Sequence, residues 1–528
     1  MKPITPHWAD LTAAKIIRNF DNKDSFTVAS GITPSGTVHI GNFREVITVD
    51  LVARALRSAG KEVRFIYSWD DFDTFRKVPV NMPNQKEMEG HLRKSISKVP
   101  DAYGKAASYA RSNMDLFEGE LKKMGIFPEY LVQHERYGDG LYAEQMRKAL
   151  EEKEVIKKIL NRYRQTPLAD DWLPTAIYCE ACDKDEMVYQ RYEGEWEYAY
   201  KCASCGHEAK SDIRKTKNLK LNWRTDWPMR WHYEKVDFEP GGKDHSSEGG
   251  SYDTASVIVK DVYGGRAPEY LQYDFVSIKG MEEKMSSSKG NLITLSEAME
   301  VYEPQMIRWI FAGHRPNHDF SLSFDQDVIK TYDEFDRAEK KALGEKPAKP
   351  GNWPVVRRTY ELSLVEEGNL PKEAPYRAPF RELCTRLQIV DGDIEKACAK
   401  FYADEVKTDL DRALFKTRSL LALNWLKNYA PEEFIYTLNK EPVQVSCTKE
   451  QEKGLVALRD LINKIDLEAI TSKEVNEHIY QEVIHKLEIE AKDFFQVVYQ
   501  RLISRDRGPR LPSFLKEIGR ERLLNLLS

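Results

Sequence analysis

A strand, a glycine-bearing turn and a helix follow one another near the start of the chain. The strand-like run covers 26–32, the turn at 34–42 reads Pro-Ser-Gly-Thr-Val-His-Ile-Gly-Asn, and the helix continues to Gly60. Apolar residues recur at helical spacing along one face of that helix. This order presents backbone N–H groups and a helix dipole to phosphates, which favours a nucleotide-binding parallel α/β sheet.

Two residues of the turn offer specific chemistry. Neither the Gly-x-Gly-x-x-Gly pattern nor the Walker lysine loop is present, so the turn is neither a dinucleotide fingerprint nor a P-loop. His39 can carry a positive charge or donate a hydrogen bond, and Gly41 lacks the Cβ that would keep a flat base away from the backbone. The alternative is an ordinary helix start with a surface histidine, and the turn alone does not decide.

A second stretch far along the chain combines two lysines with three hydroxyls. It reads Lys-Met-Ser-Ser-Ser-Lys-Gly-Asn at 284–291 and is bracketed by Gly280 and Gly290. Such a loop suits a triphosphate whose negative charge grows as pyrophosphate leaves. The alternative is a charged surface loop.

Together and in this order, the two stretches resemble the paired signatures of the class I aminoacyl-tRNA synthetases, usually His-Ile-Gly-His and Lys-Met-Ser-Lys-Ser. Here Asn42 replaces the second histidine and Ser287 the second lysine, so Lys289 is expected to supply the second positive charge. Mg²⁺ is expected with ATP as its usual counterion. The resemblance implies that four residues are catalytic: His39, Asn42, Lys284 and Lys289. It implies an ATP site made of Pro34, Gly36, Thr37, His39, Gly41, Asn42, Lys284, Met285, Ser286, Ser287 and Ser288.

Four of the seven cysteines form two C-x-x-C pairs with nineteen residues between them. The pairs are Cys179 with Cys182, and Cys202 with Cys205. This spacing predicts a ribbon at about 175–210 that holds a structural Zn²⁺ with four thiolates and no open position. A redox pair or chance are the alternatives.

Further motifs narrow the resemblance to the class I lysyl-tRNA synthetase family, in the glutamyl-like branch. They are 31–36, the cysteine ribbon, 223–231, 242–245 and 284–290. The resemblance implies lysine, ATP and tRNA(Lys) as partners, with tRNA bound before lysine is activated. The alternatives are a glutamyl or cysteinyl enzyme of the same class, or a catalytically silent tRNA-binding module.

A lysine pocket needs a carboxylate for the ammonium and flat apolar walls for the stem, and aromatic faces also favour a cation. Gly31 and Thr33, at the end of the first strand, are expected to hold the α-amino end. The remaining candidates are Trp223, His245 and Tyr273 as walls, with Asp226 or Glu269 meeting the ammonium. The alternative is that these aromatic residues are plain core.

Charged residues flank these motifs. The predicted strand 61–70 ends at Asp70, and Asp71 and Asp73 follow it, where acidic side chains of an open α/β sheet face the ligand crevice or form a solvated loop. A basic run follows the ribbon and is expected either along an RNA backbone or as a solvated face. Its members are Lys210, Arg214, Lys215, Lys217, Lys220 and Arg224.

The composition indicates which broad class of protein the chain belongs to. The 528 residues are 41% hydrophobic and 31% charged with a net charge of −5, which is typical of a globular protein without a global attraction to nucleic acid. No apolar run reaches the roughly 18 residues of a membrane span, and no signal-peptide core is present, so we expect a cytoplasmic protein with no membrane partner.

The expected fold is a split, doubly wound parallel sheet with an inserted helical and zinc-ribbon region and an all-α C-terminal domain. The predicted segments are 1–75 and 221–291 for the two halves of the nucleotide-binding domain, 76–220 for the insertion, 292–345 for a helical stem-contact region, and 352–528 for an anticodon-binding domain.

Overall fold

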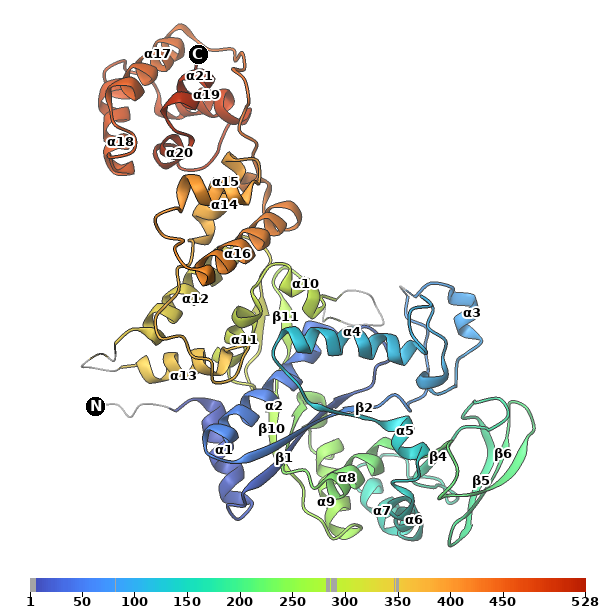
Figure 1. Cartoon of the computed structure of the whole chain (residues 1–528). Coiled ribbons are helices and arrows are strands. Elements are labelled where there is room, and N and C mark those ends of the chain that lie inside the picture. The colour runs from blue at the N-terminus through green and yellow to red at the C-terminus, as the bar shows by residue number, and fades with distance from the viewer. Residues whose placement is uncertain (1–5, 81, 282–284, 286–291, 346, 348–350) are drawn as a thin grey trace. The chain divides into compact units, whose positions relative to one another are not determined.

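The structure, a computed structural model, describes residues 6–80, 82–281, 285, 292–345, 347 and 351–528 (Figure 1). The chain divides into two compact units. The first comprises 1–299, 304–322 and 345–370, and the second comprises 300–303, 323–344 and 371–528. The five predicted segments stay a prediction about domains, and the contacts divide the segment 292–345 between the two units.

The first unit is built on a five-stranded sheet of order β10-β9-β1-β2-β3. Its strands are β1 (Ser25–Ile32), β2 (Glu62–Trp69), β3 (Glu129–Val132), β9 (Phe238–Gly242) and β10 (Glu269–Tyr273). Every neighbouring pair is parallel. The carboxyl ends of the strands therefore meet at one edge, where open α/β sheets bind ligands.

Helices cover both faces of this sheet (Figure 1). On one face Ser30 of β1 bonds to Glu45 of α2 (Ile40–Ser58). On the other, Ala29 packs in a cluster with Trp231 of α8 (Trp223–Glu234) and Val259 of α9 (Ser251–Asp261). Successive strand residues point to opposite faces, so the doubly wound prediction is confirmed.

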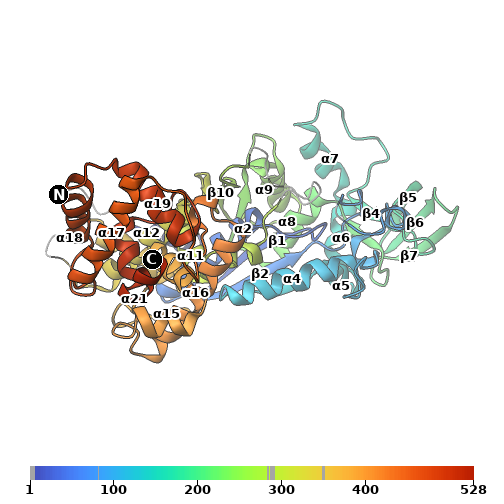
Figure 2. The ribbon, with the colours of Figure 1, turned by 90° about the horizontal axis from the view of Figure 1, so that it is seen from above.

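The inserted region contains helices and a ribbon. Its helices are α3 (Gln85–Glu89), α4 (Tyr109–Lys123), α5 (Gln133–Gly138), α6 (Ala143–Glu151) and α7 (Lys153–Asn161). The ribbon strands β5 (Met187–Gly194), β6 (Glu197–Cys202) and β7 (Glu208–Asp212) form an antiparallel sheet (Figure 2). β4 (Thr175–Ile177) pairs with β8 (Leu219–Leu221), so the chain enters and leaves the ribbon side by side.

Two strands differ from the prediction. β3 belongs to the main sheet although it lies inside the predicted insertion 76–220; four residues beginning with Glu129 give a weak strand pattern. The predicted last strand 269–279 is two strands. After β10 the chain leaves the sheet at Asp274, whose N–H donates to Pro316, and β11 (Val276–Ile278) pairs with β12 (Phe320–Leu322) instead.

The other helices of the first unit are α1 (Trp8–Asn19), α10 (Leu295–Met299), α11 (Pro304–Gly313) and α13 (Trp353–Ser363). The second unit is helical in its described residues. Its helices are α12 (Asp327–Leu343), α14 (Phe380–Ile389), α15 (Ile394–Phe401), α16 (Asp409–Asn428), α17 (Lys449–Lys464), α18 (Ser472–His478), α19 (Ala491–Ile503), α20 (Leu511–Ile518) and α21 (Arg520–Leu526). The all-α C-terminal prediction is confirmed. Within the described part of the chain, no helix is long and apolar enough to cross a membrane.

Candidate active site

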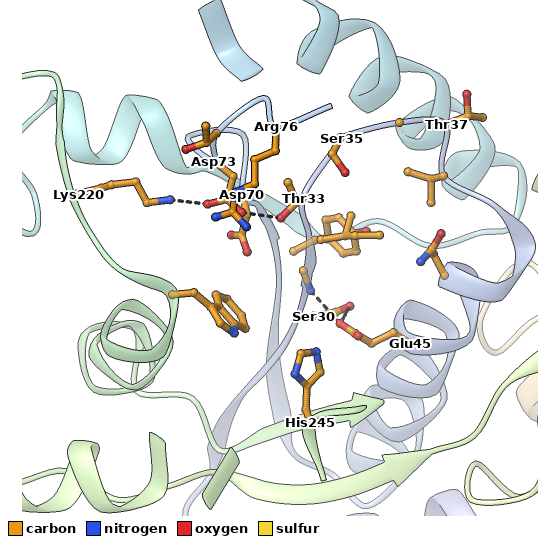
Figure 3. A pocket seen from close by; sticks show the side chains of 18 of the residues that line it. Ser30, Thr33, Ser35, Thr37, Glu45, Asp70, Asp73, Arg76, Lys220 and His245 are labelled. Carbon is orange, nitrogen blue, oxygen red and sulfur yellow. Dashed lines mark hydrogen bonds and ion pairs between the residues drawn. The ribbon is translucent and has the colours of Figure 1, made fainter. Parts of the chain in front are cut away.

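A cavity of about 600 Å³ lies at the carboxyl edge of the main sheet (Figure 3). It takes residues from the ends of β1 and β10, from the first turns of α2 and α8, and from the loop after β2. Nine residues predicted for the ATP or amino-acid site line it: Gly31, Thr33, Gly36, Thr37, His39, Asn42, Trp223, His245 and Tyr273. The acid-rich loop contributes Asp70 and Asp73, as the crevice interpretation predicts.

The first signature forms the N-terminus of α2. Nδ1 of His39 accepts from the N–H of Gly41 at 3.1 Å, and Oδ1 of Asn42 accepts from the N–H of His39 at 3.2 Å. These two bonds form a reciprocal cap, in which Asn42 uses its side-chain oxygen on the backbone. A Cβ at Gly41 would lie 2.8 Å from the His39 ring, so the glycine also makes room for the imidazole.

The segment after the second signature lies against the first. Thr294 bridges to His39, and the N–H of Ile40 donates to Ile293 at 2.8 Å. Met285 is 6% exposed, and its Cε would lie 3.4 Å from a Cβ at Gly41. The other predicted residues of that signature, Lys284, Ser286, Ser287, Ser288 and Lys289, lie outside the described residues. Pro34 is fixed from α4, where the side-chain amide of Asn113 donates to its carbonyl.

Glu45, one turn beyond Gly41 on α2, presents a carboxylate to the cavity. Its Oε1 accepts from the Ser30 hydroxyl at 2.9 Å and the Gly31 N–H at 3.1 Å, and its Oε2 accepts from the Tyr273 hydroxyl at 2.7 Å. Burial raises the pKa of Glu45, although these three hydrogen bonds oppose the shift. All three donors are neutral, so a bound cation would find an oriented carboxylate whose charge is not yet balanced by an ion pair.

Aromatic rings form one wall of the cavity. Trp223 stacks on Trp227 at 5.2 Å between ring centroids, and the His245 ring lies 6.3 Å from Trp223. Burial lowers the pKa of His245, so the imidazole is neutral near pH 7 and does not repel a cation. The indole N–H groups of Trp227 and Trp231 both donate to Glu239, which fixes the tryptophans behind the wall.

The opposite wall carries a chain of polar contacts. Lys220 forms an ion pair with Asp73 at 2.5 Å, and the Thr33 hydroxyl donates to the other oxygen of Asp73 at 2.9 Å. Burial opposes ionisation of Asp73, but Lys220 outweighs it and the pKa of Asp73 is lowered. Asp70, one turn earlier in the loop, pairs with Arg230 at 2.7 Å.

The two carboxylates predicted for the ammonium lie elsewhere. Asp226 is buried, where it accepts from the Tyr137 hydroxyl and forms an ion pair with Arg230 at 3.1 Å. Glu269 begins β10, so it lies at the amino edge of the sheet, where it bonds to Asn19 and Lys15. Neither residue lines the cavity.

Sequence reasoning missed Glu45 and misplaced Lys220. Glu45 follows His39 and Asn42 at intervals of three, which puts all three on one helix face, and that spacing was the available signal. Lys220 was expected in a solvated or RNA-facing basic run, but it is 8% exposed and points into the cavity wall. Strand β8 buries Leu219 and Leu221 on either side of it, and that apolar context was the signal for Lys220.

The four ribbon cysteines converge. Their Sγ atoms all lie within 4.8 Å of one another, with 3.6 Å between Cys179 and Cys205 and between Cys182 and Cys202. Four thiolates about 2.3 Å from a tetrahedral zinc ion lie about 3.8 Å apart, so the donor set fits this metal.

Comparison with known proteins places this site in a class of enzymes. Residues 6–366 match the family described as tRNA synthetases class I (K). The chain is 43% identical to the lysine–tRNA ligase of Treponema pallidum, covering 99% of this chain and 98% of that one. It is 44% identical to the lysine–tRNA ligases of Borrelia garinii and Thermococcus kodakarensis, covering 99% of each chain.

The parallel sheet, the capped signature helix and the matching sequence profile define a class I aminoacyl-tRNA synthetase. Within that class, the chain belongs to the tRNA synthetases class I (K) family. The family resemblance inferred from the signatures and the ribbon is confirmed.

Proposed function

We propose that this protein is a lysine–tRNA ligase, which activates lysine with ATP and transfers it to the 3′ end of tRNA(Lys). The observation that carries the proposal is the oriented carboxylate of Glu45, held by Tyr273 beside an aromatic wall. The full-length similarity to curated lysine–tRNA ligases supports it independently.

In the proposed pocket, the ε-ammonium of lysine pairs with Glu45. The apolar stem lies along Trp223 and His245, whose rings favour a cation near their faces. The α-amino end lies at Gly31 and Thr33, where Asp73 adds a second carboxylate. In this proposal Glu45 meets the ammonium, instead of Asp226 or Glu269, which were predicted from the sequence.

The chemistry proceeds in two displacements. The lysine carboxylate attacks the α-phosphorus of ATP, and the bond from that phosphorus to the bridging oxygen breaks to release pyrophosphate. The terminal ribose hydroxyl of tRNA then attacks the carbonyl carbon of lysyl-adenylate, and AMP leaves. Neither step needs a side-chain nucleophile, so positioning and electrostatic stabilisation carry catalysis.

The ATP end of the site is proposed from the two signatures. His39 stabilises charge on the phosphates, Asn42 holds the backbone that presents His39, and Gly41 seats the adenine ring. Lys284 and Lys289, with the hydroxyls between them, are proposed to hold the departing pyrophosphate. Mg²⁺ supplies further charge neutralisation when it accompanies ATP.

The remaining proposals concern zinc, tRNA and location. Cys179, Cys182, Cys202 and Cys205 are proposed to hold one structural Zn²⁺ per chain, and metal analysis of the purified protein tests this directly. Residues 352–528 are proposed to read the anticodon, and activation is proposed to require bound tRNA, as the resemblance implies. The protein is proposed to act in the cytoplasm.

A glutamate-specific pocket is the nearest rival, and it would need an unpaired arginine. Arg230 is buried between Asp70 and Asp226, and Arg224 is exposed and donates to the Gly249 carbonyl. Neither of these two arginines lines the cavity; Arg76, from the loop after β2, does line it, next to Asp73 and away from Glu45 (Figure 3). A silent tRNA-binding module, the other rival, gives no reason for an oriented Glu45 beside a capped signature helix.

Pyrophosphate exchange tests the proposal. With ATP and total tRNA present, exchange should respond to lysine and stay at background with glutamate, arginine or cysteine. Exchange driven by one of those three instead would overturn the assignment, and ATP binding without any exchange would favour the silent module.

A further inference from the structure

Lys220 differs from the rest of the basic run because its ammonium is buried. It comes from β8, which belongs to the inserted region, and it reaches the loop that follows β2 of the main sheet. Its Nζ lies 2.5 Å from Oδ1 of Asp73 and donates to the carbonyl of Phe72 at 3.3 Å. The ion pair therefore joins the insertion to the edge of the sheet that carries the cavity.

Asp73 connects Lys220 to the amino-acid pocket. Its Oδ2 accepts from the Thr33 hydroxyl at 2.9 Å, and Figure 3 shows Lys220, Asp73 and Thr33 in one line. The Asp73 side chain is 35% exposed, so it faces the cavity while both of its oxygens are engaged. The position of Asp73 thus decides where the Thr33 hydroxyl lies.

The same loop is held by the insertion at its neighbouring residues. The hydroxyl of Tyr178 donates to the Phe72 carbonyl at 2.9 Å and lies 3.0 Å from Oγ1 of Thr74. The Thr74 hydroxyl donates to Asp185 at 2.7 Å. The loop 72–74 is therefore fixed at each of its three residues by a side chain of the insertion, and Lys220 is the one that reaches Asp73.

We infer that Lys220 is a positioning residue through which the insertion, by way of Asp73, holds Thr33 ready for the α-amino end of lysine. The inference rests on the proposed function, because it assigns Thr33 to the α-amino end of that substrate. Lys220 itself does not touch lysine. When the charge of Lys220 is removed, Asp73 loses its ion-pair partner and no longer holds the Thr33 hydroxyl in place. Lysine binding then weakens, whereas ATP binding does not.

A double-mutant cycle in the full-length enzyme tests this. We compare Lys220→Met, Thr33→Val and the double variant by tRNA-dependent pyrophosphate exchange, with Lys158→Met on the exposed face of α7 as the matched control. Each single variant should raise KM for lysine by about tenfold, the scale of one hydrogen bond to a charged group. KM for ATP should stay within about twofold of wild type, well inside the tenfold change for lysine. The double variant should be no worse than the worse single variant, because both break the same contact.

Three outcomes decide the inference. Multiplicative effects on KM for lysine, or an unchanged or lowered KM in Lys220→Met, would overturn it. If Lys220→Met does not fold, Lys220→Gln serves in its place, since it can still donate to the Phe72 carbonyl without a charge. A wild-type enzyme that does not respond to lysine would instead overturn the proposed function, so the two failures are distinguishable.

Discussion

The cavity of the first unit and an ion cluster in the second unit both gather charged side chains, but they balance them differently. In the second unit Glu303 pairs with Arg377 at 2.6 Å and with Arg418 at 3.1 Å, and Arg418 also pairs with Asp336 at 2.8 Å. In the cavity, Glu45 accepts three hydrogen bonds from neutral groups. Among the residues that the structure describes, no lysine or arginine forms an ion pair with Glu45.

The pKa shifts record the same contrast. Burial opposes ionisation of Glu303, but its two arginines outweigh burial and lower its pKa. Burial dominates at Glu45 and raises its pKa. A carboxylate balanced by its own protein stabilises the fold, whereas one held only by neutral donors is available to a cationic ligand. This difference separates structural charge from the proposed lysine site.

The largest expected effect comes from breaking the balanced cluster. Arg418→Met leaves Glu303 and Asp336 short of a partner, and losing one partner of a buried pair costs about 3–5 kcal/mol. Urea unfolding should show that loss in the free energy of unfolding. Arg412→Met, on the exposed side of the same helix α16, is the control and should change it little. A stable Arg418→Met variant would mean that the cluster is not the balanced structural element described above.

At the ATP end of the site the charges are reversed: a lysine of the protein is proposed to meet an anionic ligand. The proposed phosphate contacts need a cation, so Lys284→Ala should lower the rate of lysine activation by about 10²-fold, the scale for losing one transition-state electrostatic contact. The measurement is single-turnover activation at saturating lysine, ATP and tRNA. An unchanged rate would remove Lys284 from the proposed catalytic residues, and Lys279→Ala, outside the signature, is the comparison.

Loosening Glu45 without discharging it should have a smaller effect. Tyr273→Phe removes the 2.7 Å hydrogen bond to Oε2 but keeps the ring and the carboxylate. We expect KM for lysine to rise about tenfold, as for one hydrogen bond to a charged group, with KM for ATP unchanged. Equal changes in both constants would indicate a general distortion of the site.

The smallest expected effect is the pH dependence of lysine binding. Because burial raises the pKa of Glu45, a proton competes with the ammonium as pH falls, so KM for lysine should rise as pH is lowered toward that raised pKa. Burial also raises the pKa of the neighbouring Glu239, to about 7, so its charge is lost in the same direction. KM for lysine in Glu45→Gln should lose most of this dependence. A profile as steep as that of wild type would assign the titration to another group.

Much of the fold was predictable because its signals are local. The strand–turn–helix unit follows from a glycine-bearing turn between two periodic segments, and the cysteine cluster follows from spacing alone. The strand β3 was missed because four residues carry too little pattern to outweigh the helices around them.

The pocket residues were predictable only where the position of a residue along its strand fixes the edge of the sheet at which it lies. Gly31, next to the last residue of β1, and Tyr273, the last residue of β10, reach the cavity, whereas Glu269 begins the same strand as Tyr273 and lies at the other edge. Asp226 follows Trp223 by three residues, yet only the tryptophan lines the cavity, because Asp226 turns to Tyr137 and Arg230. Tyr137 lies 89 residues from Asp226 in the sequence and Asn19 lies 250 residues from Glu269, and local pattern contains no information about partners so distant.

The central claim is that Glu45 receives the ammonium of lysine, and discrimination against a neutral isostere tests it most directly. We would measure tRNA-dependent exchange with lysine and with 6-hydroxynorleucine, which replaces the ammonium by a hydroxyl, in wild type, Glu45→Gln and the exposed control Glu62→Gln. Wild type and Glu62→Gln should prefer lysine by about 10²-fold or more in kcat/KM, the scale of a buried charge pair. Glu45→Gln should lose nearly all of that preference, because its kcat/KM for lysine falls. A Glu45→Gln enzyme that keeps the wild-type preference would contradict the account.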